Sequence, residues 1–106
     1  MPPGYARLLE EARERLRAAF GARLRDVVLY GSVARGEAGP DSDIDLLVLL
    51  RDEPVEPGDS WTCIEALYPI VLETGRPIHA EPVAASVCDS DRFPLYRNAR
   101  REGIPL

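Results

Sequence analysis

The sequence predicts an α+β domain with a mixed β-sheet and helices packed mainly on one face of that sheet. Three observations predict this class: an amphipathic helical stripe near the start, two strand-like runs joined by a glycine-rich segment, and further helical and strand-like patterns after them. The length of 106 residues suits a single domain over 1–106.

The first half of the chain predicts one helix and two strands. Apolar residues recur at helical spacing from Tyr5 to Phe20, and Gly21 stands where such a helix ends. Residues 26–30 form a β-branched and aromatic run typical of a strand. Residues 43–50 begin polar and become wholly apolar, which predicts a buried strand whose start lies at an exposed site.

The second half predicts a loop over residues 51–58, a helix capped by Asp59 or Ser60, a third strand over 76–85 and a short helix over 94–102. Pro69 lies inside the helical pattern, so we expect that helix to kink or split there. Pro82 cannot donate to a sheet ladder, so it places the third strand at an edge or places itself at a strand end.

The charge composition excludes several classes of function. The formal net charge is -5, which disfavours nucleic acid and anionic membranes as partners. All 13 basic residues are Arg, so neither a Schiff-base lysine nor a P-loop lysine is available. No apolar run reaches the length of a membrane span.

The cysteine and histidine content predicts a cytoplasmic protein with no structural zinc. Cys63 and Cys88 form no Cys-x-x-Cys pattern, so we expect two reduced, buried thiols. His79 is the sole histidine, which argues against a His-rich zinc site and against a His-based relay. The first residues contain no apolar signal stretch.

Two aspartates at the start of the second strand carry the clearest chemical signal. Asp43 and Asp45 are two residues apart, so in a strand they project side by side while Ile44 points to the core. Two adjacent carboxylates repel each other unless a cation lies between them. Oxygen ligands of this kind suit Mg²⁺, which completes its shell with water and substrate phosphates.

The glycine-rich segment before these aspartates predicts a phosphate site. Gly31 allows a tight exit from the first strand and a close approach of phosphate to the backbone. Ser32 opens a helical turn, so its hydroxyl and the first free N–H groups form an anion-binding corner, and Arg35 can add a bidentate cation.

Together these two motifs resemble a known family. Gly31-Ser32 with Arg35-Gly36, followed by Ser42-Asp43-x-Asp45-Leu46-x-Val48, is similar to the signature of minimal nucleotidyltransferase domains of the polymerase-beta-like superfamily. The resemblance is specific over residues 30–50, and the order of elements extends it over nearly the whole chain. It implies the small nucleotidyltransferase fold.

The resemblance also implies roles for individual residues. Gly31 and Ser32 would bind the triphosphate, and Asp43 and Asp45 would hold two Mg²⁺ ions. A third carboxylate on the next long strand would share one ion, and Glu81 is the candidate, although it is Glu where Asp is more usual. The implied reaction is in-line attack of an acceptor hydroxyl on the α-phosphorus of a nucleoside triphosphate, for which we expect ATP.

Plainer roles stay open for several of these residues. The two aspartates could be ordinary strand-entry residues, Glu81 a solvated edge carboxylate, and Arg35 a surface residue. His79 shares strand parity with Glu81 and could line the site. Trp61 and Tyr68 are expected in the core or at an interface.

Two functions follow as expectations. The first is a Mg²⁺-dependent nucleotidyltransferase that works with a separate helical partner of the HEPN type, or as a homo-oligomer. The alternative is a catalytically weak or inactive binding module, the antitoxin-like member of a toxin-antitoxin pair, which covers its partner's surface.

Overall fold

The computed structural model describes residues 4–39, 41–51, 54–90 and 93–106. The start of the chain, for which the sequence predicts no signal stretch, lies largely outside them. The described residues form, in chain order, α1 (Ala6–Phe20), a 3-10 turn (Gly21–Arg23), β1 (Leu24–Tyr30), α2 (Gly31–Ala34), β2 (Ile44–Leu50), α3 (Pro57–Thr74), β3 (Ile78–Ala84), α4 (Ala85–Cys88), α5 (Pro94–Glu102) and β4 (Ile104–Pro105).

The sheet is mixed, as predicted, with the strand order β3-β2-β1-β4. β1 pairs antiparallel with both β2 and β4, whereas β2 and β3 run parallel. β3 is therefore an edge strand, and the prediction from Pro82 is confirmed. The backbone N–H of Ile44 donates to the Pro77 carbonyl (2.9 Å), so Pro77 and every second residue after it turn their backbone polar groups toward β2. Pro82 is five residues after Pro77, so its nitrogen points away from β2, to the outer side of the sheet where no strand needs an N–H.

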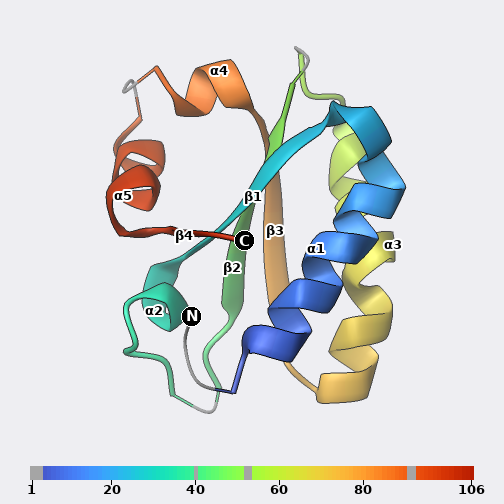
Figure 1. The fold of residues 1–106 in the computed structure, drawn as a ribbon, viewed down its shortest axis with the longest axis vertical. Helices are drawn as coiled ribbons and strands as arrows, with labels where there is room; N and C mark the ends of the chain where they lie inside the picture. Colours follow the sequence, from blue (N-terminus) through green and yellow to red (C-terminus); the bar gives the residue numbers. More distant parts are fainter. Residues whose placement is uncertain (1–3, 40, 52–53, 91–92) are drawn as a thin grey trace.

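The two long helices, α1 and α3, cover one face of the sheet (Figure 1). Alternate β2 residues Ile44, Leu46, Val48 and Leu50 enter this core with Leu9, Leu16, Leu67 and Ile70 from the helices. The intervening residues of β2 face the other way, because side chains alternate along a strand. Helices packed mainly on one face are thus confirmed.

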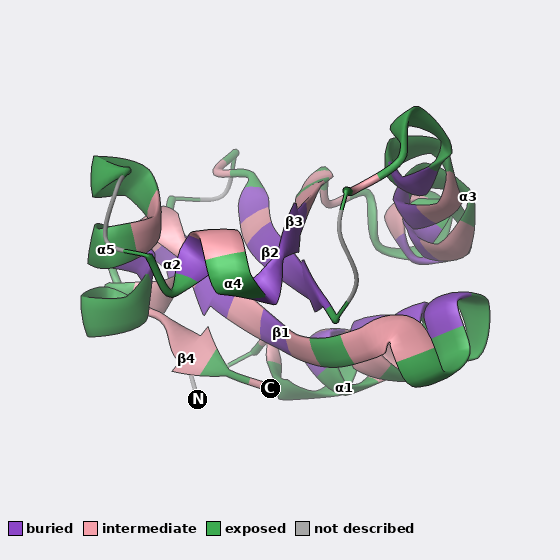
Figure 2. Ribbon diagram, turned by 90° about the horizontal axis from the view of Figure 1, so that it is seen from above, coloured by how far each residue is buried: buried purple, intermediate pink, exposed green. Residues whose placement is uncertain are grey.

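The shorter helices α4 and α5 lie over part of the opposite face (Figures 1 and 2). A second, smaller cluster there joins Leu47, Leu49, Val83, Ala85, Cys88 and Ala99. On β2 the cluster begins at Leu47, two residues after Asp45, so it leaves the start of β2 partly open on this face.

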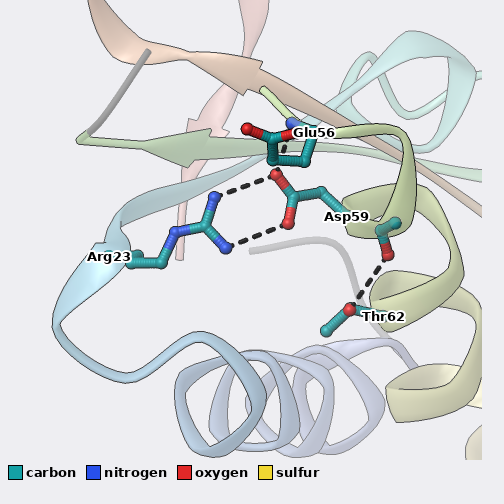
Figure 3. Close-up of polar contacts among 5 residues, drawn as sticks. Arg23, Glu56, Asp59 and Thr62 are labelled. Carbon is teal, nitrogen blue, oxygen red and sulfur yellow. Dashed lines mark hydrogen bonds and ion pairs between the residues drawn. The ribbon is translucent and has the colours of Figure 1, made fainter. Parts of the chain in front are cut away.

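The N-terminus of α3 corrects one prediction. Neither Asp59 nor Ser60 is the cap: the helix starts at Pro57, with Glu56 as N-cap and Asp59 as the third helical residue of a capping box. Asp59 accepts the Glu56 N–H (2.9 Å) and two hydrogen bonds from the Arg23 guanidinium (both 2.9 Å), as Figure 3 shows. This ion pair ties the end of α1 to the start of α3.

Of the two outcomes expected at Pro69, a kink or a split, the split does not occur, because α3 is one helix across this residue. Pro69 is exposed, so the carbonyl it leaves unbonded, that of Glu65 one turn earlier, can be hydrated. Trp61 and Tyr68 are not in the core either: their side chains are 65% and 55% exposed. An interface remains the other expected role for them.

Two short elements were not predicted, α4 directly after β3 and β4 in the C-terminal tail. Gly103 makes the tail strand possible, since a Cβ there would overlap the Ala99 carbonyl and the Val28 side chain. Both cysteines are buried as expected. Within the described ranges, no helix is long and apolar enough to span a membrane.

Candidate nucleotide and metal site

The candidate residues lie in rows across the open face of the sheet. Strand register places Tyr30, Asp45 and His79 side by side on β1, β2 and β3. The next row holds Val28, two residues before Tyr30 on the antiparallel β1, and Leu47 and Glu81, two residues after Asp45 and His79 on β2 and β3. The first row is therefore the polar row, and the second begins the apolar cluster.

The predicted phosphate turn directly follows the polar row. Gly31 begins α2 with a φ of 76°, in the left-handed region that favours glycine. A Cβ at this position would overlap a carboxylate oxygen of Asp45. The absence of a side chain at Gly31 thus brings the turn against the carboxylate. The first N–H groups of such a turn lack intrahelical partners and suit an anion.

Asp43 and Asp45 stand two residues apart around the start of β2, and the charge of Asp43 acts on the Asp45 carboxylate. Asp43 is exposed just before β2, and Asp45 is the second residue of the strand with a half-buried side chain. Burial raises the pKa of Asp45, and the negative charge of Asp43 raises it further. A cation bound between these carboxylates would remove that repulsion. Their oxygen chemistry and position fit a hard divalent ion.

Glu81 lies one row away from Asp45. Its register partner is Leu47, so its backbone stands about 7 Å further along the sheet than the polar row, two strand residues away. Its charge raises the pKa of both Tyr30 and Tyr96, so the Glu81 carboxylate acts electrostatically on both phenols. In the described part of the chain, no three Asp, Glu, His or Cys side chains are gathered closely enough to hold a metal ion.

His79 is the side chain from β3 that lies next to Asp45. Its Nδ1 is 3.9 Å from Asp45 Oδ1, and the imidazole is 66% exposed. The imidazole lowers the pKa of Asp45, whereas burial and Asp43 raise it, so His79 favours the ionised carboxylate. The sequence predicts that His79 and Glu81 lie on the same face of the strand, because they are two residues apart. It does not predict which of them pairs with Asp45, because that depends on strand register.

Arg35 lies at the end of α2 between two acids. Its Nε donates to Glu37 (3.0 Å), and its Nη1 is 3.7 Å from Glu102 on α5. The hydrogen bond to Glu37 is the main reason that the pKa of Arg35 is raised. An incoming phosphate would have to compete with these carboxylates for the guanidinium.

A cavity of about 230 Å³ adjoins the phosphate turn, and no pattern in the sequence predicts it. Its walls come from β1, α2 and α5: Tyr30, Gly31, Arg35, Leu95, Asn98, Ala99 and Glu102. Burial, with the charges of Asp45 and Glu81, raises the pKa of Tyr30 to about 12. The phenol is thus neutral at ordinary pH and available as a hydrogen-bond donor beside the turn.

Solved structures share this fold. A crystal structure of a toxin-antitoxin complex with AMP-PNP matches with a TM-score of 0.60 at 18% identity, over 91% of this chain and 70% of that chain. A mutant of the toxin-antitoxin complex MntA-HpeT matches with a TM-score of 0.57 at 19% identity, over 92% and 70%. At these identities the likeness concerns the fold alone.

The chain also has relatives in sequence. The chain is 34% identical over 88 residues to the bifunctional uridylyltransferase/uridylyl-removing enzyme of Thiobacillus denitrificans, which is 79% of this chain and 10% of that protein. It is 40% identical over 66 residues to a Methanocaldococcus jannaschii protein provisionally named a protein adenylyltransferase, over 62% and 43%. The chain thus spans a tenth to less than half of the length of these relatives.

A family model described as a nucleotidyltransferase domain matches residues 9–102. That match runs from α1 to the last residue of α5 and includes the phosphate turn and both aspartates. The chain therefore belongs to the nucleotidyltransferase domain family.

Proposed function

We propose that this chain transfers a nucleoside monophosphate from a nucleoside triphosphate, ATP in the first instance, to an acceptor hydroxyl in a Mg²⁺-dependent reaction. One observation carries the proposal: Gly31 has no side chain, so the phosphate turn and the Asp45 carboxylate adjoin each other. A triphosphate bound at the turn would therefore lie beside the carboxylate pair.

The carboxylates fit two Mg²⁺ ions by their donor atoms and by their mutual repulsion. Asp43 and Asp45 would hold the ions, and we propose Glu81 as the third carboxylate, reaching from the second row through its longer side chain. Bound there, Mg²⁺ would supply Lewis-acid chemistry, lowering the pKa of the acceptor hydroxyl and neutralising the leaving group.

The protein's own residues would bind and position the substrate. The α2 turn with Ser32 would hold the triphosphate, with Arg35 added once phosphate displaces its carboxylate partners. The acceptor oxygen would form a bond to the α-phosphorus as its hydroxyl proton passes to water, the bond from that phosphorus to the oxygen bridging to the β-phosphate would break, and pyrophosphate would leave with the electron pair of that bond. Positioning and charge stabilisation are the main demands on such a site.

We propose that the acceptor is brought by a helical partner of the HEPN type in the cytoplasm. Solvent reaches the polar row at the His79 imidazole, which is mostly exposed, and Asp43 just before β2 is exposed too. A second protein could therefore approach the carboxylates directly. The solved structures of similar fold are complexes of two proteins, which is in keeping with this arrangement.

Calorimetric titration with Mg²⁺-ATP tests nucleotide binding. We expect saturable heat with the native chain, loss of the Mg²⁺-dependent part in Asp43→Asn, and native behaviour in Asp41→Asn, which removes an exposed carboxylate two residues earlier. Transfer of label from ATP to a helical partner should then require Asp43. Equal transfer by Asp43→Asn would refute the assignment.

A binding module without catalysis is the second candidate. The carboxylate partners of Arg35 and the position of Glu81 in the second row both favour a site of weak activity. In that case the titration would give no heat at millimolar nucleotide. Asp43→Asn would then leave neutralisation of a toxin partner intact, whereas the enzymatic proposal predicts that neutralisation fails.

A further inference from the structure

The outer side of α3 carries an apolar stripe that the fold does not use. Four large side chains on this helix are more than half exposed: Trp61 at 65%, Ile64 at 54%, Tyr68 at 55% and Leu72 at 66%. At about 100° per residue they fall within roughly a quarter of the helix circumference. The residues that α3 buries, Cys63, Leu67 and Ile70, lie on its other side, toward the sheet. Figure 2 shows the exposed side of α3 turned outward.

The stripe continues into a hollow of about 250 Å³ at the edge of the sheet. Ile64, Tyr68 and Val71 of α3 form one wall, and Pro77, Ile78 and Ala80 at the start of β3 form another. The apolar surface therefore includes both a ridge and a neighbouring depression. A contiguous patch of this kind on a small protein marks an interaction site.

The charges around the stripe indicate what it binds. α3 contains no basic residue, and of its acids only Glu65 lies at the rim of the stripe, while Asp59 is buried in its pair with Arg23. An uncharged centre resembles the core of a protein–protein interface. A cationic partner would find little to pair with, whereas a second copy of the same surface adds only its own Glu65, whose repulsion across the two-fold axis is weakened by its exposure to solvent.

We propose that two copies of this chain associate through α3, with the two helices antiparallel about a two-fold axis near residue 66. Trp61 and Leu72 lie at nearly equal distances on either side of that point, and so do Ile64 and Tyr68. Each aromatic side chain then meets an aliphatic one of the second copy. Such a self-complementary patch is what a two-fold dimer requires.

The area is sufficient for a specific dimer. The exposed parts of the four side chains on both copies, with the surface beside them, amount to roughly 1,000 Å², the lower bound for a specific interface. The net charge of -5 on each copy opposes association, but only weakly at physiological salt. The stripe lies across the sheet from the polar row, so dimerisation leaves the nucleotide site open.

Sedimentation velocity of the full chain over a wide concentration range tests the dimer. We expect a species of twice 11.7 kDa that dissociates on dilution. Trp61 is the only tryptophan, so its emission should shift to longer wavelength as the dimer separates. Tyr68→Glu should weaken association at least about tenfold, as for an interface hot spot. A chain that stays monomeric at every concentration would overturn the proposal and assign the stripe to a different protein.

Leu95→Glu is the matched control, because Leu95 is an exposed apolar residue (45%) on α5, away from the stripe. It should sediment like the native chain. Circular dichroism of Tyr68→Glu should remain native, since Tyr68 is more than half exposed. If Leu95→Glu dissociates the dimer as strongly as Tyr68→Glu does, α3 is not the interface.

Cysteine cross-linking tests the antiparallel arrangement. A mixture of Trp61→Cys and Leu72→Cys should form mixed disulfide dimers, because these positions would face each other. Neither variant alone should cross-link, since equivalent positions would be about 16 Å apart along the helices, beyond the reach of a disulfide. The native thiols are buried and would not interfere. Links within one variant, or none in the mixture, would contradict this register.

Discussion

Gly31 and Asp45 are in contact across the end of the β1–β2 pair, and the contact exists because Gly31 has no Cβ. An ideal Cβ on Gly31 would overlap Asp45 Oδ2, and the φ of Gly31 is 76°. The same residue thus fixes the path of the chain into α2 and the place of a carboxylate. The proposed nucleotide site depends on that juxtaposition.

We predict that Gly31→Ala both destabilises the fold and weakens nucleotide binding. The left-handed backbone costs an alanine about 1–2 kcal/mol, and the new methyl group displaces the Asp45 carboxylate. Thermal unfolding and titration with Mg²⁺-ATP measure the two effects.

Gly36→Ala is the control for this prediction. Its φ is 73°, but open space surrounds its Cβ position, so only the backbone strain should appear. A loss of nucleotide affinity equal to that of Gly31→Ala would mean that the contact with Asp45 is irrelevant to the site.

The ion pair between Arg23 and Asp59 should stabilise the packing of α1 on α3. Asp59 is only 4% exposed and accepts two hydrogen bonds from Arg23 and one from the Glu56 N–H. We predict that Asp59→Ala lowers the free energy of unfolding by about 2 kcal/mol, because it removes both the capping-box acceptor of the Glu56 N–H and the partner of Arg23. Urea denaturation measures this, with Glu65→Ala on the exposed side of α3 as the control.

The same carboxylate should make stability depend on pH in the acid range. Hydrogen bonding from Arg23 is the main cause that lowers the pKa of Asp59 below its ordinary 3.8. A carboxyl with a lowered folded-state pKa stabilises the fold fully above its unfolded pKa, and this contribution is lost as the pH falls through the lower value. The stability difference between the native chain and Asp59→Asn should therefore be constant above about pH 5 and shrink toward pH 2. A difference independent of pH would exclude the charged pair as its origin.

The role of Asp59 shows where reasoning from the sequence succeeded and where it failed. Residue pattern alone located α1, β1, β2 and the motif from Gly31 to Asp45, because periodicity and spacing are local properties. The sequence pattern allows Asp59 to be either the N-cap or the third residue of a capping box. Its contacts with Glu56 and with the distant Arg23 decide between the two roles, and the pattern does not contain them. The split expected as one outcome at Pro69 does not occur, and the exposure of Pro69, which leaves its unbonded carbonyl partner open to water, is set by tertiary packing. The rows across the sheet depend on strand register, and this is why the sequence named Glu81 without finding that His79 lies beside Asp45.

The two cysteines should be unreactive in the folded chain. Cys63 is fully buried, and burial raises the pKa of its thiol to about 12; burial also raises the pKa of Cys88. Because the thiolate is the reactive form, a disulfide reagent should label neither thiol until the chain unfolds. The rate of labelling with and without denaturant measures this, and Cys88→Ala isolates Cys63. Rapid labelling of native Cys88→Ala would show that α3 opens.

The proposed third metal ligand can be tested by comparing two residues of β3. We predict that Glu81→Gln weakens the Mg²⁺-dependent part of ATP binding by about tenfold, the scale of a lost metal-site contact, and leaves metal-free binding unchanged. His79→Gln keeps a polar side chain in the polar row and should alter that dependence much less. The alternative is that His79 is the third ligand. The two residues lie in different places, because His79 Nδ1 is 3.9 Å from Asp45 Oδ1, whereas Glu81 must reach across from the row of Leu47. Titrations at several Mg²⁺ concentrations distinguish the two: if metal dependence disappears in His79→Gln and persists in Glu81→Gln, the register partner of Asp45 completes the site and Glu81 does not.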